Sequence, residues 1–254
     1  MSDSKTYVAS IDLRGTPRGI VKMSAAEEAS EVFDSAKQQA QVVGSALFSF
    51  ARGVTAETRE AISDSALLAQ LVANKRASVA TAPLAWYGEY LQVLQNVGWV
   101  MQQAGWADHT ADGTAAEVHE KIIEVLKVAL GPGAAVADIV ASAIKELKAI
   151  QPESSWFTIF SRESQHASIA RFQIGLAEPG ENDDVFVSML ACLIEAQAAI
   201  AQVLLFKFRS EHATFRANSA KVSINRPALV DLGPAIRAKV RAYQADYLGS
   251  IKDI

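Results

Sequence analysis

The sequence predicts an α/β (α+β) protein with a single domain over residues 1–254, in which an antiparallel β-sheet is flanked by helical layers. Residues 20–150 are rich in alanine and repeat their apolar side chains at helical spacing. Residues 156–225 instead alternate apolar with polar side chains and carry β-branched and aromatic residues, as strands do. A chain of 254 residues suits one large domain or two small ones, and since no repeat or low-complexity linker divides it, we expect one.

The N-terminal region is expected to contain a strand, a turn and a long helix. The strand covers residues 7–13 and the turn covers 14–17, which include a glycine and a proline. A capping box of Ser24 and Glu27 would begin the helix, and Gly53 would end it. Its apolar face would consist of Ala25, Ala29, Val32, Ala36, Ala40, Val43, Leu47 and Phe50.

Two further helices are expected between this helix and residue 107. Thr55 can cap the first, and Pro83 can occupy the first turn of the second. The apolar face of the first would include Ile62, Ala66, Leu67 and Leu71. Aspartates and glycine at residues 107–113 then predict a loop.

A pair of amphipathic helices is predicted next. Apolar residues recur at helical spacing over 118–129 and again over 136–147. The Gly-Pro-Gly sequence at 131–133 would turn the chain between them, and Pro152 would end the second helix. The two helices would therefore form an αα-hairpin.

The remainder of the chain predicts a sheet followed by one helix. Four strands are expected, at residues 168–176, 185–197, 202–209 and 214–224. Since they follow one another closely, an antiparallel meander is the simplest arrangement, with an acidic turn at 178–184 and a bend within 195–201. A final helix is expected at 234–248.

Charge and composition exclude several classes of protein. The net charge is −4 and the pI about 5.6, so the chain lacks the basic field of a nucleic-acid-binding protein. Cys192 is the one cysteine, and an internal disulfide is therefore impossible. Neither a secretory signal peptide nor a run of about 20 apolar residues is recognisable. We expect a soluble protein that is released without a cleavable signal peptide.

Motifs of catalysis or metal binding do not stand out. His119 and Glu120 are not followed by the second histidine of the zinc-protease motif. No Gly-x-Ser-x-Gly elbow and no phosphate-binding Gly-x-x-x-x-Gly-Lys loop occurs. The acidic turn at 178–184 lacks the oxygen spacing of a calcium loop. We therefore expect no enzymatic activity and no bound metal.

Three short strings, in their order and spacing, resemble one known group of proteins. They are Ile122–Lys127 in a predicted amphipathic helix, Trp156-Phe157 with Ser161–Glu163 before a strand, and Gln202–Phe206 within a strand. Over roughly residues 115–230 the chain is similar to the Cyt-type cytolytic endotoxins and the related Erwinia virulence factor. The resemblance implies one Cyt-like α/β domain that is soluble first and then acts at target-cell membranes.

The resemblance leads to one leading hypothesis and two alternatives. The leading one is a membrane-active cytolysin or virulence factor, with the lipid membrane as partner and homo-oligomers as a further expectation. The first alternative is a non-lytic protein that binds lipid or a fatty acyl group, since the Erwinia factor is described as carrying an acyl group on a cysteine. The second alternative is an uncharacterised enzyme. Apart from bound or covalent fatty acid, no cofactor is expected.

Two sets of candidate residues follow from these hypotheses. Cys192 would share one strand face with Phe186, Leu190 and Ile194, where it is a small core residue, an acyl acceptor or a nucleophile. The residues expected to contact a membrane are apolar side chains of one strand and one tryptophan in a loop. They are Leu204, Phe206, Phe208 and Trp106.

Overall fold

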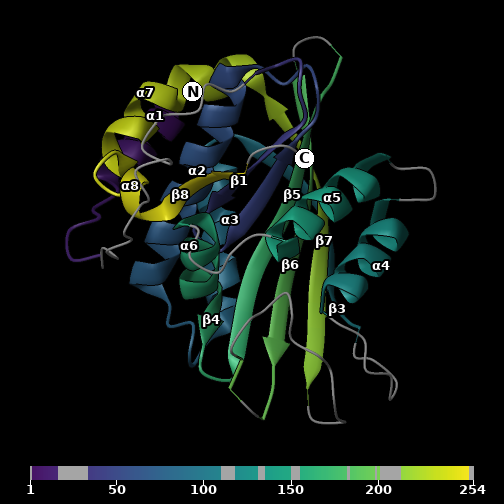
Figure 1. Ribbon diagram of the computed structural model, residues 1–254. Helices are drawn as coiled ribbons and strands as arrows, with labels where there is room; N and C mark the ends of the chain where they lie inside the picture. Colours follow the sequence, from purple (N-terminus) through teal and green to yellow (C-terminus); the bar gives the residue numbers. More distant parts are fainter. Residues whose placement is uncertain are drawn as a thin grey trace.

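The fold is seen in a computed structural model, which describes residues 2–16, 34–109, 118–130, 135–149, 155–181, 184–197, 199–200 and 213–251. Within these residues, helices cover both faces of a mixed β-sheet (Figure 1). The helices are α1 (Ser2–Ser10), α2 (Ala56–Arg76), α3 (Pro83–Asn96), α4 (Val118–Leu130), α5 (Ala135–Ala149), α6 (Ser155–Ser164), α7 (Arg226–Val240) and α8 (Gln244–Tyr247). The strands are β1 (Gln39–Val43), β2 (Ala46–Phe50), β3 (Trp99–Asp108), β4 (Gln165–His166), β5 (Ile169–Pro179), β6 (Asp184–Glu195), β7 (Thr214–Asn225) and β8 (Leu248–Ile251).

The sheet has the order β3-β7-β6-β5-β2-β1-β8, and β4 pairs with β5. Strands β5, β6 and β7 form the expected antiparallel meander. The prediction of a purely antiparallel sheet is wrong at one place, because β2 and β5 are parallel. Parallel neighbours need a long connection, and here the chain between β2 and β5 includes five helices, α2 to α6. The α/β class with helices on both faces is confirmed.

The predicted long helix up to Gly53 is wrong in the part that the structure describes. Residues 39–50 form the hairpin β1–β2, and the capping box of Ser24 and Glu27 lies outside the described residues. Gly44 makes the turn at φ +55°, and a Cβ there would lie 2.4 Å from Oε1 of Gln70. Glycine alone fits so close an approach in this conformation.

The N-terminal strand predicted at residues 7–13 is also wrong. Residues 2–10 form α1, which packs against α7 and buries Val8. The ammonium group of Lys239 in α7 donates to the carbonyl oxygens of Ala9 and Ile11 at 2.9 and 2.7 Å. Contacts with a distant helix therefore override the weak local pattern.

Three other elements differ from the expectation. Strand β3 was not expected, and it includes the first two residues of the loop predicted at 107–113. Helix α6 was not expected either. The final helix, α7, begins eight residues before Pro234 because Asn225 caps it, accepting from the backbone N–H of Ala228 at 2.9 Å. The chain then continues through α8 into β8, where a longer helix was expected.

The best-defined sequence patterns are confirmed. Thr55 caps α2 through its side chain, which accepts from the N–H of Thr58 at 3.2 Å, and Pro83 begins α3. Helices α4 and α5 and strands β5, β6 and β7 lie where the patterns place them. The strand expected at 202–209 and the Gly-Pro-Gly turn at 131–133 fall outside the described residues.

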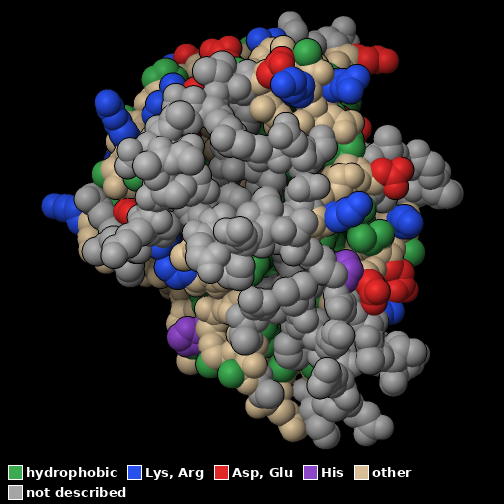
Figure 2. Space-filling model, viewed as in Figure 1, with side chains coloured by type: hydrophobic (Ala, Val, Ile, Leu, Met, Phe, Trp, Pro, Cys, Tyr) green, Lys and Arg blue, Asp and Glu red, His purple; other side chains and the backbone are tan. Residues whose placement is uncertain are grey.

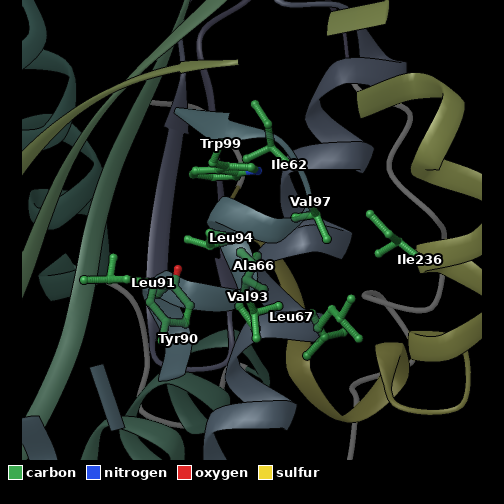
Figure 3. Close-up of a cluster of buried hydrophobic side chains, with 14 of the residues drawn as sticks. Ile62, Ala66, Leu67, Tyr90, Leu91, Val93, Leu94, Val97, Trp99 and Ile236 are labelled. Atoms are coloured by element: carbon green, nitrogen blue, oxygen red, sulfur yellow. The ribbon is translucent and has the colours of Figure 1, made fainter. Parts of the chain in front are cut away.

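Each face of the sheet is closed by its own core. The first core joins one face to α2, α3 and α7, and Figure 3 shows part of it. It includes Phe48, Ile62, Leu67, Trp86, Tyr87, Tyr90, Leu94, Trp99, Val187, Met189, Leu193 and Ile236. The second core joins the other face to α4, α5 and α6. It includes Leu47, Val118, Ile122, Leu126, Val140, Ile144, Phe160, Phe172, Leu190, Cys192, Ile194 and Phe215.

The outer surface is mixed in charge. On the side seen in Figure 2, Lys and Arg side chains lie among Asp and Glu side chains, without one large basic area in the described part. Among the described residues, no helix is both long enough and apolar enough to span a bilayer.

Candidate functional site

The central strand β6 is apolar on both faces, which makes it the link between the two cores. Its alternate residues enter the first core at Val187, Met189, Ala191 and Leu193. The residues between them enter the second core at Leu190, Cys192 and Ile194. A strand buried on both faces can expose apolar surface on either side once a helical layer moves away.

Three of the four residues predicted around Cys192 lie together. Leu190, Cys192 and Ile194 are each fully buried in the second core. Phe186 lies on the same strand face but is 49% exposed. Burial raises the pKa of the Cys192 thiol well above its ordinary value, so the thiol is protonated and a poor nucleophile in the closed protein.

The exposed Phe186 belongs to an open row on the second face of the sheet. Ser223 of β7 lies opposite Val100 of β3 on one side and opposite Phe186 of β6 on the other. Directly opposed residues of antiparallel strands point to the same face. Val100 is 66% exposed, so the row presents two large apolar side chains to solvent. Val100 was not among the predicted site residues, because strand β3 was not expected from the sequence.

Trp106 is less exposed than expected. It is partly buried against the first core, and its ring centroid lies 5.0 Å from that of Tyr87. Leu204, Phe206 and Phe208, the other residues predicted to contact a membrane, lie outside the described residues. Trp86 and Trp99 are core residues.

The first face of β5 carries polar residues that are nonetheless buried. Arg171 and Gln173 are 2% and 0% exposed beneath α2 and α3. The guanidinium of Arg171 donates through Nη1 to Oγ of Ser45 at 2.7 Å and through Nη2 to Oδ1 of Asn74 at 3.1 Å. Its Cζ lies 3.5 Å from the centroid of the Trp86 ring, a cation–π contact.

Tyr87 of α3 connects this polar cluster to the backbone of both central strands. Its hydroxyl lies 2.8 Å from the carbonyl oxygen of Phe172 and 2.7 Å from that of Cys192. It also accepts from Nε2 of Gln173 at 3.3 Å. Burial raises the pKa of Tyr87, so its hydroxyl stays a donor at any ordinary pH.

Gln70 of α2 fixes the β1–β2 turn to the same cluster. Its Oε1 accepts from the backbone N–H of Ser45 at 2.9 Å and from Oγ of Ser45 at 3.1 Å. Its Nε2 donates to the carbonyl oxygen of Val43 at 2.7 Å. The first helical layer is therefore held to the sheet by directional hydrogen bonds.

The cluster consists of hydrogen-bonded side chains around one cation–π contact. Desolvation lowers the pKa of Arg171 to about 10, which still leaves it a cation near neutrality. The described residues contain no group of histidine, cysteine or acidic side chains suited to a metal ion. The sequence offered one signal for this cluster, the polar residues that alternate along β5, but it could not show that α3 covers them.

No protein-family model and no curated protein sequence matches the chain. Several solved structures do match. One is a delta-endotoxin with 12% identity and a TM-score of 0.36, a match covering 85% of this chain and 91% of that chain. Another is the activated Cyt2Ba monomer from Bacillus thuringiensis subsp. israelensis, at 13% identity and a TM-score of 0.30, covering 55% of this chain and 79% of that one. A third is the Evf virulence factor, at 13% identity and a TM-score of 0.33, covering 97% of this chain and 90% of that one. These structures belong to the group that the three sequence strings resemble.

Proposed function

We propose that the protein is a membrane-active cytolysin or virulence factor, which folds in water and then binds and permeabilises lipid membranes. The observation that carries this proposal is the apolar character of β6 on both faces. Strands β5, β6 and β7 have 11, 12 and 12 residues. A strand of about 9–11 residues is enough to cross the hydrocarbon region of a bilayer. Loss of one helical layer would thus offer lipid an apolar surface of sufficient length.

The α4–α5 pair gives this proposal a second support. Helix α4 buries Val118, Ile122 and Leu126, whereas Glu124 and Lys127 on its other side are exposed. A helix with one apolar and one charged face can lie in the headgroup region of a bilayer. The exposed pair Val100 and Phe186 supplies an apolar first contact without any rearrangement.

The proposal also defines the partner and the assembly. The partner is a lipid surface, and the action is physical rather than enzymatic. Backbone groups of strands that enter hydrocarbon must all be paired, so strands from several copies would have to associate there. A homo-oligomer is accordingly part of the proposal for the membrane-bound state.

Dye release from liposomes tests the proposal directly. Purified protein is titrated onto vesicles of neutral and anionic composition, at neutral and acid pH. We expect release at low protein-to-lipid ratio, and weaker binding by a Val100→Ser/Phe186→Ser variant, because it lacks the exposed apolar row. A matched control, Leu84→Ser, removes a 40% exposed side chain from α3 and should bind as the unchanged protein does. Absence of both release and binding in every condition would refute the proposal.

A second candidate is a non-lytic protein that binds lipid or a fatty acyl group near Cys192. One observation favours it, namely that the Cys192 side chain lies wholly among apolar side chains of the second core. An acyl chain there would have to displace packed residues, which weighs against it in the closed form. The intact mass of protein from its native source decides, since an acyl adduct raises it and an unmodified mass removes this candidate.

A further inference from the structure

Arg171 is a buried cation without an acidic partner. Its side chain is 2% exposed, and among the described residues no carboxylate forms an ion pair with it. Glu163 is one of the acidic groups that act on it electrostatically, but the Glu163 carboxylate is bound to Nε of Arg162 at 2.6 Å. Nε of Arg171 itself has no hydrogen-bond partner in the described part of the chain. A buried charge in this condition opposes the closed fold.

The neighbours of Arg171 do not depend on it for hydrogen bonds. Oδ1 of Asn74 also accepts from Nε1 of Trp86 at 2.7 Å. Oγ of Ser45 has two further partners, Oε1 of Gln70 at 3.1 Å and Oε1 of Gln173 at 3.2 Å. Replacing the guanidinium by an apolar side chain of similar length would leave these groups satisfied. The hydrogen bonds of the guanidinium are therefore dispensable for the packing of α3 on β5, which leaves the cation–π contact with Trp86 as its direct attraction to α3.

The helix that covers Arg171 is rich in aromatic residues on the same side. Trp86, Tyr87 and Tyr90 lie on the buried face of α3, and Trp86 stacks with Tyr90 at a centroid distance of 5.3 Å. The Tyr90 hydroxyl is buried and has no hydrogen-bond partner among the residues that the structure describes. Tryptophan and tyrosine side chains favour the headgroup region of a bilayer, where both the ring and the polar atom are accommodated.

We propose that Arg171 makes the contact between α3 and β5 separable, and that its guanidinium binds an anionic lipid surface once α3 has moved away from β5. The guanidinium fork binds lipid phosphate in two-point contacts that the closed protein does not provide. The aromatic face of α3 enters the same headgroup layer. This inference rests on the proposed membrane activity. It adds that the layer containing α3 is the one that opens and that the lipid surface is anionic.

The test compares Arg171→Met with the unchanged protein in three measurements. They are the urea midpoint of unfolding, amide hydrogen exchange of α3, and dye release from vesicles with and without phosphatidylserine. Arg216→Met is the matched control, because Arg216 on β7 forms a partly exposed pair with Glu195. Arg171→Gln, neutral but polar, serves as the second variant.

We expect the urea midpoint of Arg171→Met to equal or exceed that of the unchanged protein. Exchange of the α3 amides and dye release from anionic vesicles should each be about tenfold slower, because a more stable closed form opens less often. Arg171→Gln should change release in the same direction, and Arg216→Met should leave all three measurements as they are.

A lower urea midpoint for Arg171→Met, or failure of this variant to fold, would overturn the inference and make Arg171 a structural anchor. Unchanged release at unchanged stability would overturn it as well. If the unchanged protein releases dye from neither kind of vesicle, the proposed function fails together with the lipid part of the inference. In that case the urea midpoint and the exchange of α3 still decide whether Arg171 opposes closure.

Discussion

Helices α2 and α3 reach the first face of the sheet through hydrogen bonds from Gln70 and Tyr87, whereas the second core is made of apolar side chains. The first interface also holds the buried cation Arg171, which has no carboxylate ion-pair partner among the described residues. Directional hydrogen bonds fix one position of a helical layer on the sheet, whereas apolar packing stabilises any position that fills the space. The first face of the sheet is thus closed by apolar packing together with directional bonds, and the second face, in the described part of the chain, mainly by apolar packing.

The largest effect should come from the apolar face. Phe160 of α6 is buried in the second core, with its ring centroid 6.1 Å from that of Phe172. Phe160→Ala should lower the free energy of unfolding by about 4 kcal/mol, because it leaves a cavity that the core only partly fills. Urea unfolding measures this change. Val128→Ala, at a side chain 79% exposed on α4, should change stability by less than about 0.5 kcal/mol.

The next effect should come from the polar tie to α2. Gln70→Leu removes the acceptor for the Ser45 N–H and the donor for the Val43 carbonyl, both of which are buried. We expect the free energy of unfolding to fall by about 3 kcal/mol, since buried backbone groups without a partner keep the full cost of desolvation. Gln102→Leu, at an exposed position of β3, is the control. Equal stability of the two variants would show that the first face does not depend on this tie.

Two tyrosines of α3 allow a finer comparison. Tyr87→Phe removes a hydroxyl bonded to the carbonyls of both β5 and β6 and should lower the free energy of unfolding by about 1.5 kcal/mol. Tyr90→Phe removes a buried hydroxyl that has no hydrogen-bond partner within the described ranges, so it should leave stability unchanged or raise it. Thermal unfolding of the two variants side by side tests this. A reversed order would mean that the hydrogen bonds of Tyr87 do not stabilise the layer.

The smallest effect concerns Cys192. Cys192→Ala should cost about 1 kcal/mol, as expected for a small buried side chain. Because burial raises its pKa, the thiol should resist thiol reagents at pH 8 in the native protein and react upon unfolding in urea. Rapid modification of native protein would show that the second layer opens readily by itself, which would reverse the contrast between the two faces.

Elements with strong local signals were predictable from the sequence. Thr55 and Pro83 marked the starts of α2 and α3, and the spacing of apolar residues gave α4 and α5. The hairpin β1–β2 was not predictable in this way, because its alanines and glutamines also fit a helical pattern. Residues 39–50 form strands rather than a helix because both strands are buried among elements distant in sequence, and a short stretch of sequence carries no information on those contacts.

The candidate site was predictable on one face and not on the other. Alternation along β6 placed Leu190, Cys192 and Ile194 together, as found. Alternation along β5 likewise places Arg171 and Gln173 on one face of that strand. It does not predict that this face is buried, since polar residues between apolar ones usually face water. Only the position of α3 above them turns that face into a buried polar cluster.

The parallel pairing of β2 with β5 determines the order in which the chain can assemble. The side chains of Ser45 and Gln173, which bond across this pair, are 128 residues apart. Bringing such distant segments together is slow, whereas the hairpins β1–β2 and β5–β6 involve only near neighbours. During synthesis of the intervening helices, the edge of β2 that later pairs with β5 stays unpaired and can associate with other chains. The outer edge of β1 stays unpaired for longer, because β8 pairs with β1 only after residue 251 has been made.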